Sequence, residues 1–75
     1  MRRVGTVSKT AQGLALVRWE GEESPEIGLV VVDESLSNVG RVVDVFGPVD
    51  RPYLAVSPRS GVRLTDLLGR KLYAR

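Results

Sequence analysis

The hydrophobic positions of this chain fall in short runs, each of which ends at glycine, proline or a group of polar residues. Short apolar runs separated by turn residues are typical of strands in a β-sandwich or a β-barrel. We predict strands over residues 3–10, 14–19, 29–33, 39–46, 53–57 and 70–74. Side chains should alternate along residues 39–46, which predicts Arg41 and Val43 on one face and Val42 and Asp44 on the other.

Two connections between these runs have their own signals. Residues 21–28 form an acidic loop around Ser24 and Pro25, and a proline at this place excludes a central strand. Residues 60–68 are ambiguous, because their leucines recur at helical spacing, with Thr65 as a candidate cap and Gly69 as a stop. We expect a single helical turn or a structured loop in that segment.

The length of the chain narrows the choice of architecture. Its 75 residues make a single domain, residues 1–75, with a thin core and no cysteine to staple it. Six short strands in this length predict an all-β fold, a small closed six-stranded barrel. Closure of the sheet also removes the exposed strand edges that would otherwise invite aggregation.

The segment from Phe46 to Tyr53 is the most informative stretch of the chain. Pro48 and Pro52 fix their own φ angles and favour extended backbone at the residue before each, so the loop cannot be helical. Together they hold the apolar side chains of Phe46, Val49 and Tyr53 in a nearly preset arrangement. A loop that is ordered before it meets a partner loses little entropy on binding. The alternative is a rigid turn whose Phe and Tyr cap the barrel core.

Charge is distributed in blocks along the chain. Residues 1–18 contain four basic and no acidic side chains, residues 19–40 contain six acidic and no basic ones, and residues 41–75 contain seven basic and three acidic ones. Nine of the eleven basic residues are arginine, a residue that suits protein interfaces as readily as RNA. Direct phosphate binding would favour a denser basic stripe, with more aromatic rings for bases to stack on.

The side chains needed for most enzyme chemistry are missing. The chain has no histidine and no cysteine, so it lacks the usual general base, thiolate nucleophile and most transition-metal ligands. We therefore predict no catalytic, cofactor-binding or metal-binding residues. Asp44 lies in an apolar strand, where we expect a buried or half-buried acceptor for backbone N–H groups near Gly47. No apolar run is long enough for a membrane-spanning helix or a signal peptide, so we expect the protein to stay where it is made.

The run from Val39 to Tyr53 resembles the core signature of the Gar-family subunit of H/ACA ribonucleoproteins. In that family a Gly-x-Val-x-Asp-x-Phe-Gly-Pro-Val segment is followed by Pro-Tyr and a strand that ends in proline, as residues 54–58 do here. Residues 3–7 and 69–73 are similar to the family's first and last strands, so the resemblance covers nearly the whole chain. The chain has no glycine-arginine-rich tail and therefore resembles the minimal archaeal form.

This resemblance implies a barrel of the elongation-factor second-domain type and a non-catalytic role in the RNA-guided pseudouridylation particle. Members of the family dock on the catalytic domain of the pseudouridine synthase, influence its thumb loop, and so assist substrate loading, product release and turnover in rRNA modification. The guide RNA and the other core proteins of the particle would be indirect partners, and no membrane partner is implied. The particle would lie in the cytoplasm of an archaeal-type cell, or in the nucleolus of a eukaryotic one.

Carried over position by position, the resemblance implies that Gly40, Asp44, Gly47 and Pro48 shape the strand and the turn. The expected partner-binding residues are Phe46, Gly47, Pro48, Val49, Pro52 and Tyr53, together with Arg41 and Val43. Two other interpretations stay open. The chain could be a ribosome-maturation or translation-factor-like barrel that binds RNA or ribosomal protein directly, or a structural subunit that leaves synthase turnover unchanged.

Overall fold

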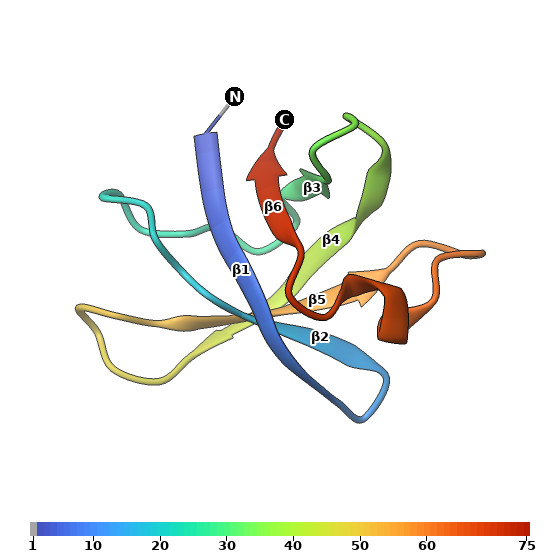
Figure 1. Ribbon diagram of the computed structural model, residues 1–75. Coiled ribbons are helices and arrows are strands. Elements are labelled where there is room, and N and C mark those ends of the chain that lie inside the picture. Colours follow the sequence, from blue (N-terminus) through green and yellow to red (C-terminus); the bar gives the residue numbers. More distant parts are fainter. Residues whose placement is uncertain (1) are drawn as a thin grey trace.

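The computed structural model describes residues 2–75, which form a closed antiparallel β-barrel (Figure 1). Its elements are β1 Arg2–Ala11, β2 Leu14–Arg18, β3 Val30–Val32, β4 Asn38–Phe46, β5 Tyr53–Pro58, the short 3₁₀ helix η1 Leu64–Leu67, and β6 Lys71–Ala74. The strand order around the barrel is β1-β2-β5-β4-β3-β6. The predicted all-β, six-stranded closed barrel is confirmed, with most strand ends within a residue of the predicted ones.

The barrel closes through the pairing of β1 with β6. β1 is long enough to pair with β2 along one stretch, where Val7 lies opposite Val17, and with β6 along another, where Arg3 lies opposite Tyr73. β6 pairs in turn with β3, where Val31 lies opposite Ala74. The N-terminal strand and the last strand therefore run side by side, as Figure 1 shows in blue and red.

The core is built mainly from small β-branched side chains, which fill the narrow interior of a barrel this size. Completely buried residues come from every strand, and the largest of them are Leu54, Leu72, Val4, Val7, Val17, Val31, Val32, Val42 and Val56. Val31 and Val32 are adjacent and both buried, as expected for an apolar run with no solvent face. Closure of the sheet and this core stabilise the strands that carry the surface features described below.

The predicted alternation along β4 holds only from Gly40 to Val43, since Val39 and Gly40 are adjacent and both buried. Arg41 is exposed and Val42 is buried, but Val43 and Asp44 are both exposed and Val45 packs against the core. The cause is an irregularity in the pairing with β5, in which Val42 lies opposite Val56 and Asp44 opposite Ala55, so that Val43 has no partner. Such a bulge shifts every later side chain to the other face of the sheet.

The ambiguous segment contains a single helical turn, as expected. Leu67 is buried in the core, and Val62 and Leu64 are partly buried and pack against it. Thr65 is not the cap that the sequence indicated, because η1 begins after Arg63 and has no side-chain cap hydrogen bond. The position of η1 is instead set by burial of its apolar side chains and by a 3.0 Å hydrogen bond from the Gly69 N–H to the Val7 carbonyl.

The acidic segment after β2 is a loop, as predicted, and it is fastened to the barrel by Trp19. The indole of Trp19 is only 7% exposed and donates a hydrogen bond of 2.8 Å to the Glu23 carbonyl. Ion pairs Arg2–Glu23 and Arg3–Glu20, each 3.1 Å long, connect this loop to β1. The N-terminal basic block and the acidic block thus pair with each other. Among residues 2–75, no helix has the length and apolar character needed to cross a membrane.

Candidate functional site

The loop between β4 and β5, residues 47–52, is a tight and well-anchored connection (yellow in Figure 1). Gly47 has a φ of +93°, a conformation that side chains with a Cβ rarely adopt. The Arg51 N–H donates to the Pro48 carbonyl at 3.2 Å, which closes a turn around Val49. The Trp19 N–H donates to the Pro52 carbonyl at 3.0 Å and so ties the loop to the end of β2. These contacts give the loop one defined shape.

An arginine and two aromatic rings form a stack where this loop meets the barrel. Phe46 and Tyr53 are paired across β4 and β5, and their rings stack with a centroid distance of 5.8 Å and an interplanar angle of 19°. The Arg18 guanidinium lies 5.3 Å from the centroid of the Tyr53 ring and donates a hydrogen bond of 2.9 Å to its hydroxyl. Arg18 is held there because it is the β2 residue paired with Tyr53.

Two apolar side chains of this region, Val49 and Phe46, face solvent rather than the core. Val49 is 99% exposed and Phe46 is 43% exposed, while Tyr53 is half-buried. Neither ring belongs to the core cluster, so the alternative in which they cap the barrel core is wrong. Pro52, which is expected among the partner-binding residues, is instead buried. Its ring packs within the protein and does not offer a contact surface. Exposed apolar side chains on a rigid loop are the kind of feature that a protein partner can bury.

Asp44 does not occupy the buried position that the sequence indicated. It is exposed, and its carboxylate accepts a hydrogen bond of 2.8 Å from the N–H of the next residue, Val45. The bulge beside it explains the difference, because the side chain is turned outward at that point. In the part of the chain that the structure describes, no three acidic side chains gather closely enough to hold a metal ion.

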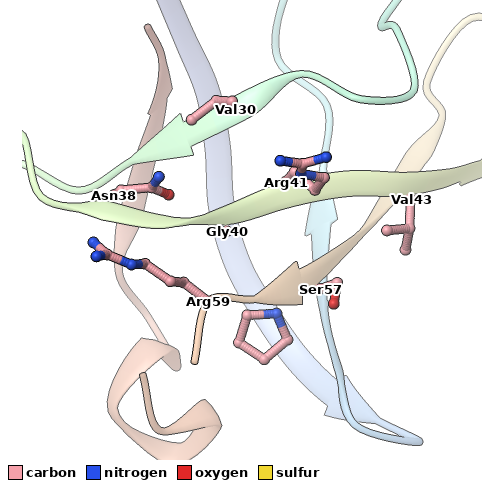
Figure 2. A pocket seen from close by; sticks show the side chains of 8 residues that line it. Val30, Asn38, Gly40, Arg41, Val43, Ser57 and Arg59 are labelled. Atoms are coloured by element: carbon pink, nitrogen blue, oxygen red, sulfur yellow. The ribbon is translucent and has the colours of Figure 1, made fainter. Parts of the chain in front are cut away.

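A groove lies on the outer face of β3, β4 and β5, at the end of the β4–β5 pair that is away from the loop at residues 47–52. It has a volume of about 230 Å³ and is lined by Val30, Asn38, Gly40, Arg41, Val43, Ser57, Pro58 and Arg59 (Figure 2). Gly40 is one of the lining residues, and a Cβ there would overlap the Ser57 carbonyl oxygen of the adjacent strand. Arg41 and Val43, both expected at a partner interface, line this groove and are set apart from the aromatic stack.

Sequence reasoning missed three residues that define these surfaces. Arg18 was assigned to a strand without a role, yet it completes the stack on Tyr53. Asn38 and Arg59 were not singled out, yet they line the groove with Arg41. Arg18 and Arg59 are distant in sequence from these neighbours, so the strand register brings them together, whereas Asn38 lies on β4 with Arg41. Only the β2–β5 register, which places Arg18 opposite Tyr53, could have identified Arg18 as part of the stack.

Comparisons with known proteins agree with the fold. The family model described as "Gar1/Naf1 RNA binding region" matches residues 1–75. An uncharacterised protein of Methanocaldococcus jannaschii is 38% identical over 56 residues, a match that covers 75% of this chain and 65% of that protein. The chain thus spans a little under two thirds of that relative. The solved structure of "the Gar1 domain of NAf1" superposes with a TM-score of 0.73 at 12% identity, over 99% of this chain and 81% of the other. At that identity the match establishes a shared fold.

Proposed function

Because this chain belongs to the Gar1/Naf1 RNA binding region family, we propose that it is a non-catalytic protein subunit of an H/ACA-type ribonucleoprotein. In this proposal it docks on the catalytic domain of the pseudouridine synthase and assists substrate loading, product release and turnover. In this proposal the guide RNA and the remaining core proteins are indirect partners, held in the same particle through the synthase. The barrel serves as a rigid base that presents the loop at residues 47–52.

The observation that carries the proposal is the exposure of Val49, at 99%, on a loop whose backbone is fixed on both sides. Burying a valine side chain stabilises a complex by roughly 1.5–3 kcal/mol. Little of that is lost to ordering, because the turn and the Phe46–Tyr53 stack exist before the partner arrives. Tyrosine, which lies next to this contact, is one of the residue types most enriched among the residues that carry most of the binding energy of an interface.

Titration of the purified synthase with wild-type protein and with Val49→Asp tests the docking step. In the complex, an aspartate at this position would lose its hydration without gaining a hydrogen bond or an ion pair. We therefore expect an affinity loss of at least about 100-fold. Ile27→Asp is the matched control, since Ile27 is also exposed, at 66%, but lies in the acidic loop. Equal affinity of wild type and Val49→Asp would remove the loop from the interface.

The turnover step needs a separate assay. With guide RNA and the other core proteins present, we expect addition of wild-type protein to raise the multiple-turnover rate more than the single-turnover rate. If the protein joins the complex but leaves both rates unchanged, it is a structural subunit only.

A second function, direct binding of single-stranded RNA, is favoured by one observation. Arg18, Tyr53 and Phe46 form an arginine–aromatic stack of the kind on which unpaired bases can pack. Binding of the isolated protein to RNA with a steep salt dependence, abolished by Tyr53→Ala, would support this function over docking on the synthase.

A further inference from the structure

The groove on β3, β4 and β5 has a composition that the proposed loop contact does not explain. Its lining contains two arginines, Arg41 and Arg59, the polar side chains of Asn38 and Ser57, and no acidic residue. Within residues 2–75, the ion pairs are Arg2–Glu23, Arg3–Glu20 and Arg70–Asp33, so neither groove arginine has a carboxylate partner. In Figure 2 the side chain of Arg59 extends toward the Asn38 end of β4, while Arg41 rises from the middle of the strand.

The groove lining also has apolar members. These are Val30, Val43 and Pro58, and Val43 is 40% exposed on the same face of β4 as Arg41. At Gly40 the backbones of β4 and β5 approach closely, since a Cβ there would overlap the Ser57 carbonyl oxygen. The groove therefore combines two cationic forks with a small apolar surface in a volume of about 230 Å³.

We propose that this groove binds an acidic side chain, with an apolar neighbour, from the same protein partner that covers the β4–β5 loop. The inference rests on the proposed function, because it assumes that partner. An arginine fork pairs with a carboxylate through two parallel hydrogen bonds, and Val30, Val43 and Pro58 offer apolar surface to the adjacent side chain.

Continuity of the surface supports a single partner. Arg41 and Phe46 are on the same strand, five residues apart, so the groove and the aromatic stack are separated by roughly 16 Å along β4. This span lies within the face that one protein–protein interface of ordinary size covers. A partner that buries Val49 and Phe46 would therefore extend to Arg41.

The lining argues for protein rather than RNA as the occupant. No aromatic ring lines the groove, and a basic track long enough for several phosphates is missing from its walls. Binders of single-stranded RNA combine both features. A carboxylate beside an apolar side chain needs only the two arginines and the valine and proline surface that the groove provides.

The test compares the affinity for the synthase of two double variants of the full chain. One is Arg41→Gln with Arg59→Gln, and the matched control is Lys9→Gln with Arg63→Gln, which removes the same charge from exposed positions outside the groove. We expect the groove variant to bind the synthase at least about tenfold more weakly at moderate salt, and the control to change affinity less than about twofold. Circular dichroism and melting temperature check that both variants are folded.

A second variant separates charge from geometry. Arg41→Lys with Arg59→Lys keeps both charges but loses the planar forks, so we expect it to recover only part of the lost affinity. Full recovery would mean that the groove contributes general positive charge instead of a carboxylate site, and would overturn the proposal.

The failures of the two proposals are distinguishable. If Val49→Asp weakens binding and the groove variant does not, the loop interface stands and the groove proposal is refuted. If the groove variant loses affinity for single-stranded RNA but binds the synthase as the wild type does, the occupant is RNA and the proposal is equally refuted. If neither variant changes synthase binding, both proposals fail.

Discussion

Replacing Tyr53 by alanine removes the centre of the arginine–aromatic stack, and its cost can be worked out from the contacts. The stack with Phe46, at 5.8 Å between centroids, contributes about 0.5–1.5 kcal/mol beyond area burial. The Arg18 guanidinium at 5.3 Å adds about 0.5–1 kcal/mol at an exposed site. With the lower strand propensity of alanine, we expect a loss of about 2 kcal/mol in the free energy of unfolding.

Thermal and urea unfolding measure that loss. For a domain of this size, 2 kcal/mol corresponds to a melting temperature lower by about 8–16 °C. Tyr53→Phe is the control, because it keeps the ring stack and loses only the exposed hydrogen bond from Arg18, which is worth about 0.5 kcal/mol. A double-mutant cycle with Phe46→Ala isolates the ring–ring coupling. A melting temperature for Tyr53→Ala within about 2 °C of the wild type, or zero coupling in the cycle, would refute the view that the stack orders this surface.

Two further substitutions test the packing that positions the site. Gly40→Ala places a methyl group on the Ser57 carbonyl oxygen, so we expect the β4–β5 ladder to loosen at a cost of about 1–3 kcal/mol; a urea midpoint equal to the wild type would contradict the close approach. Trp19→Phe keeps an aromatic ring but loses the 2.8 Å hydrogen bond to the Glu23 carbonyl, so amide exchange should accelerate in residues 20–28 while the β1–β6 amides keep their protection. Unchanged exchange in the acidic loop would show that the indole hydrogen bond does not hold it.

The barrel could be predicted from the sequence because its signals are local. Runs of β-branched residues mark the strands, and glycine, proline and acidic clusters mark the turns, so strand ends such as Tyr53 and Phe46 follow directly. The leucine spacing in residues 60–68 predicts a single helical turn or a structured loop, and the structure has the helical turn. Where the local signal was weak, as for Thr65, the cap was assigned wrongly.

The surface of the site could be predicted only in part, because it depends on register. Because of the bulge in β4, Val43 and Asp44 both face outward. An alternating pattern of apolar and polar residues contains no signal for the extra residue of a bulge. The contact of Arg18 with Tyr53 follows from a pairing between strands that are 35 residues apart. Burial of Pro52 likewise reflects how the loop folds back toward Trp19, to which its carbonyl is hydrogen-bonded.

The most direct test of the central claim is the behaviour of the Val49 methyl groups in the assembled complex. With methyl-labelled protein and a deuterated synthase, we predict large shifts of the Val49 signals and transfer of saturation from the synthase amide protons, while the exposed methyl groups of Ile27 keep their free-state positions. Val49 signals that remain at their free-state positions in a fully formed complex would contradict the claim that this loop is where the partner binds.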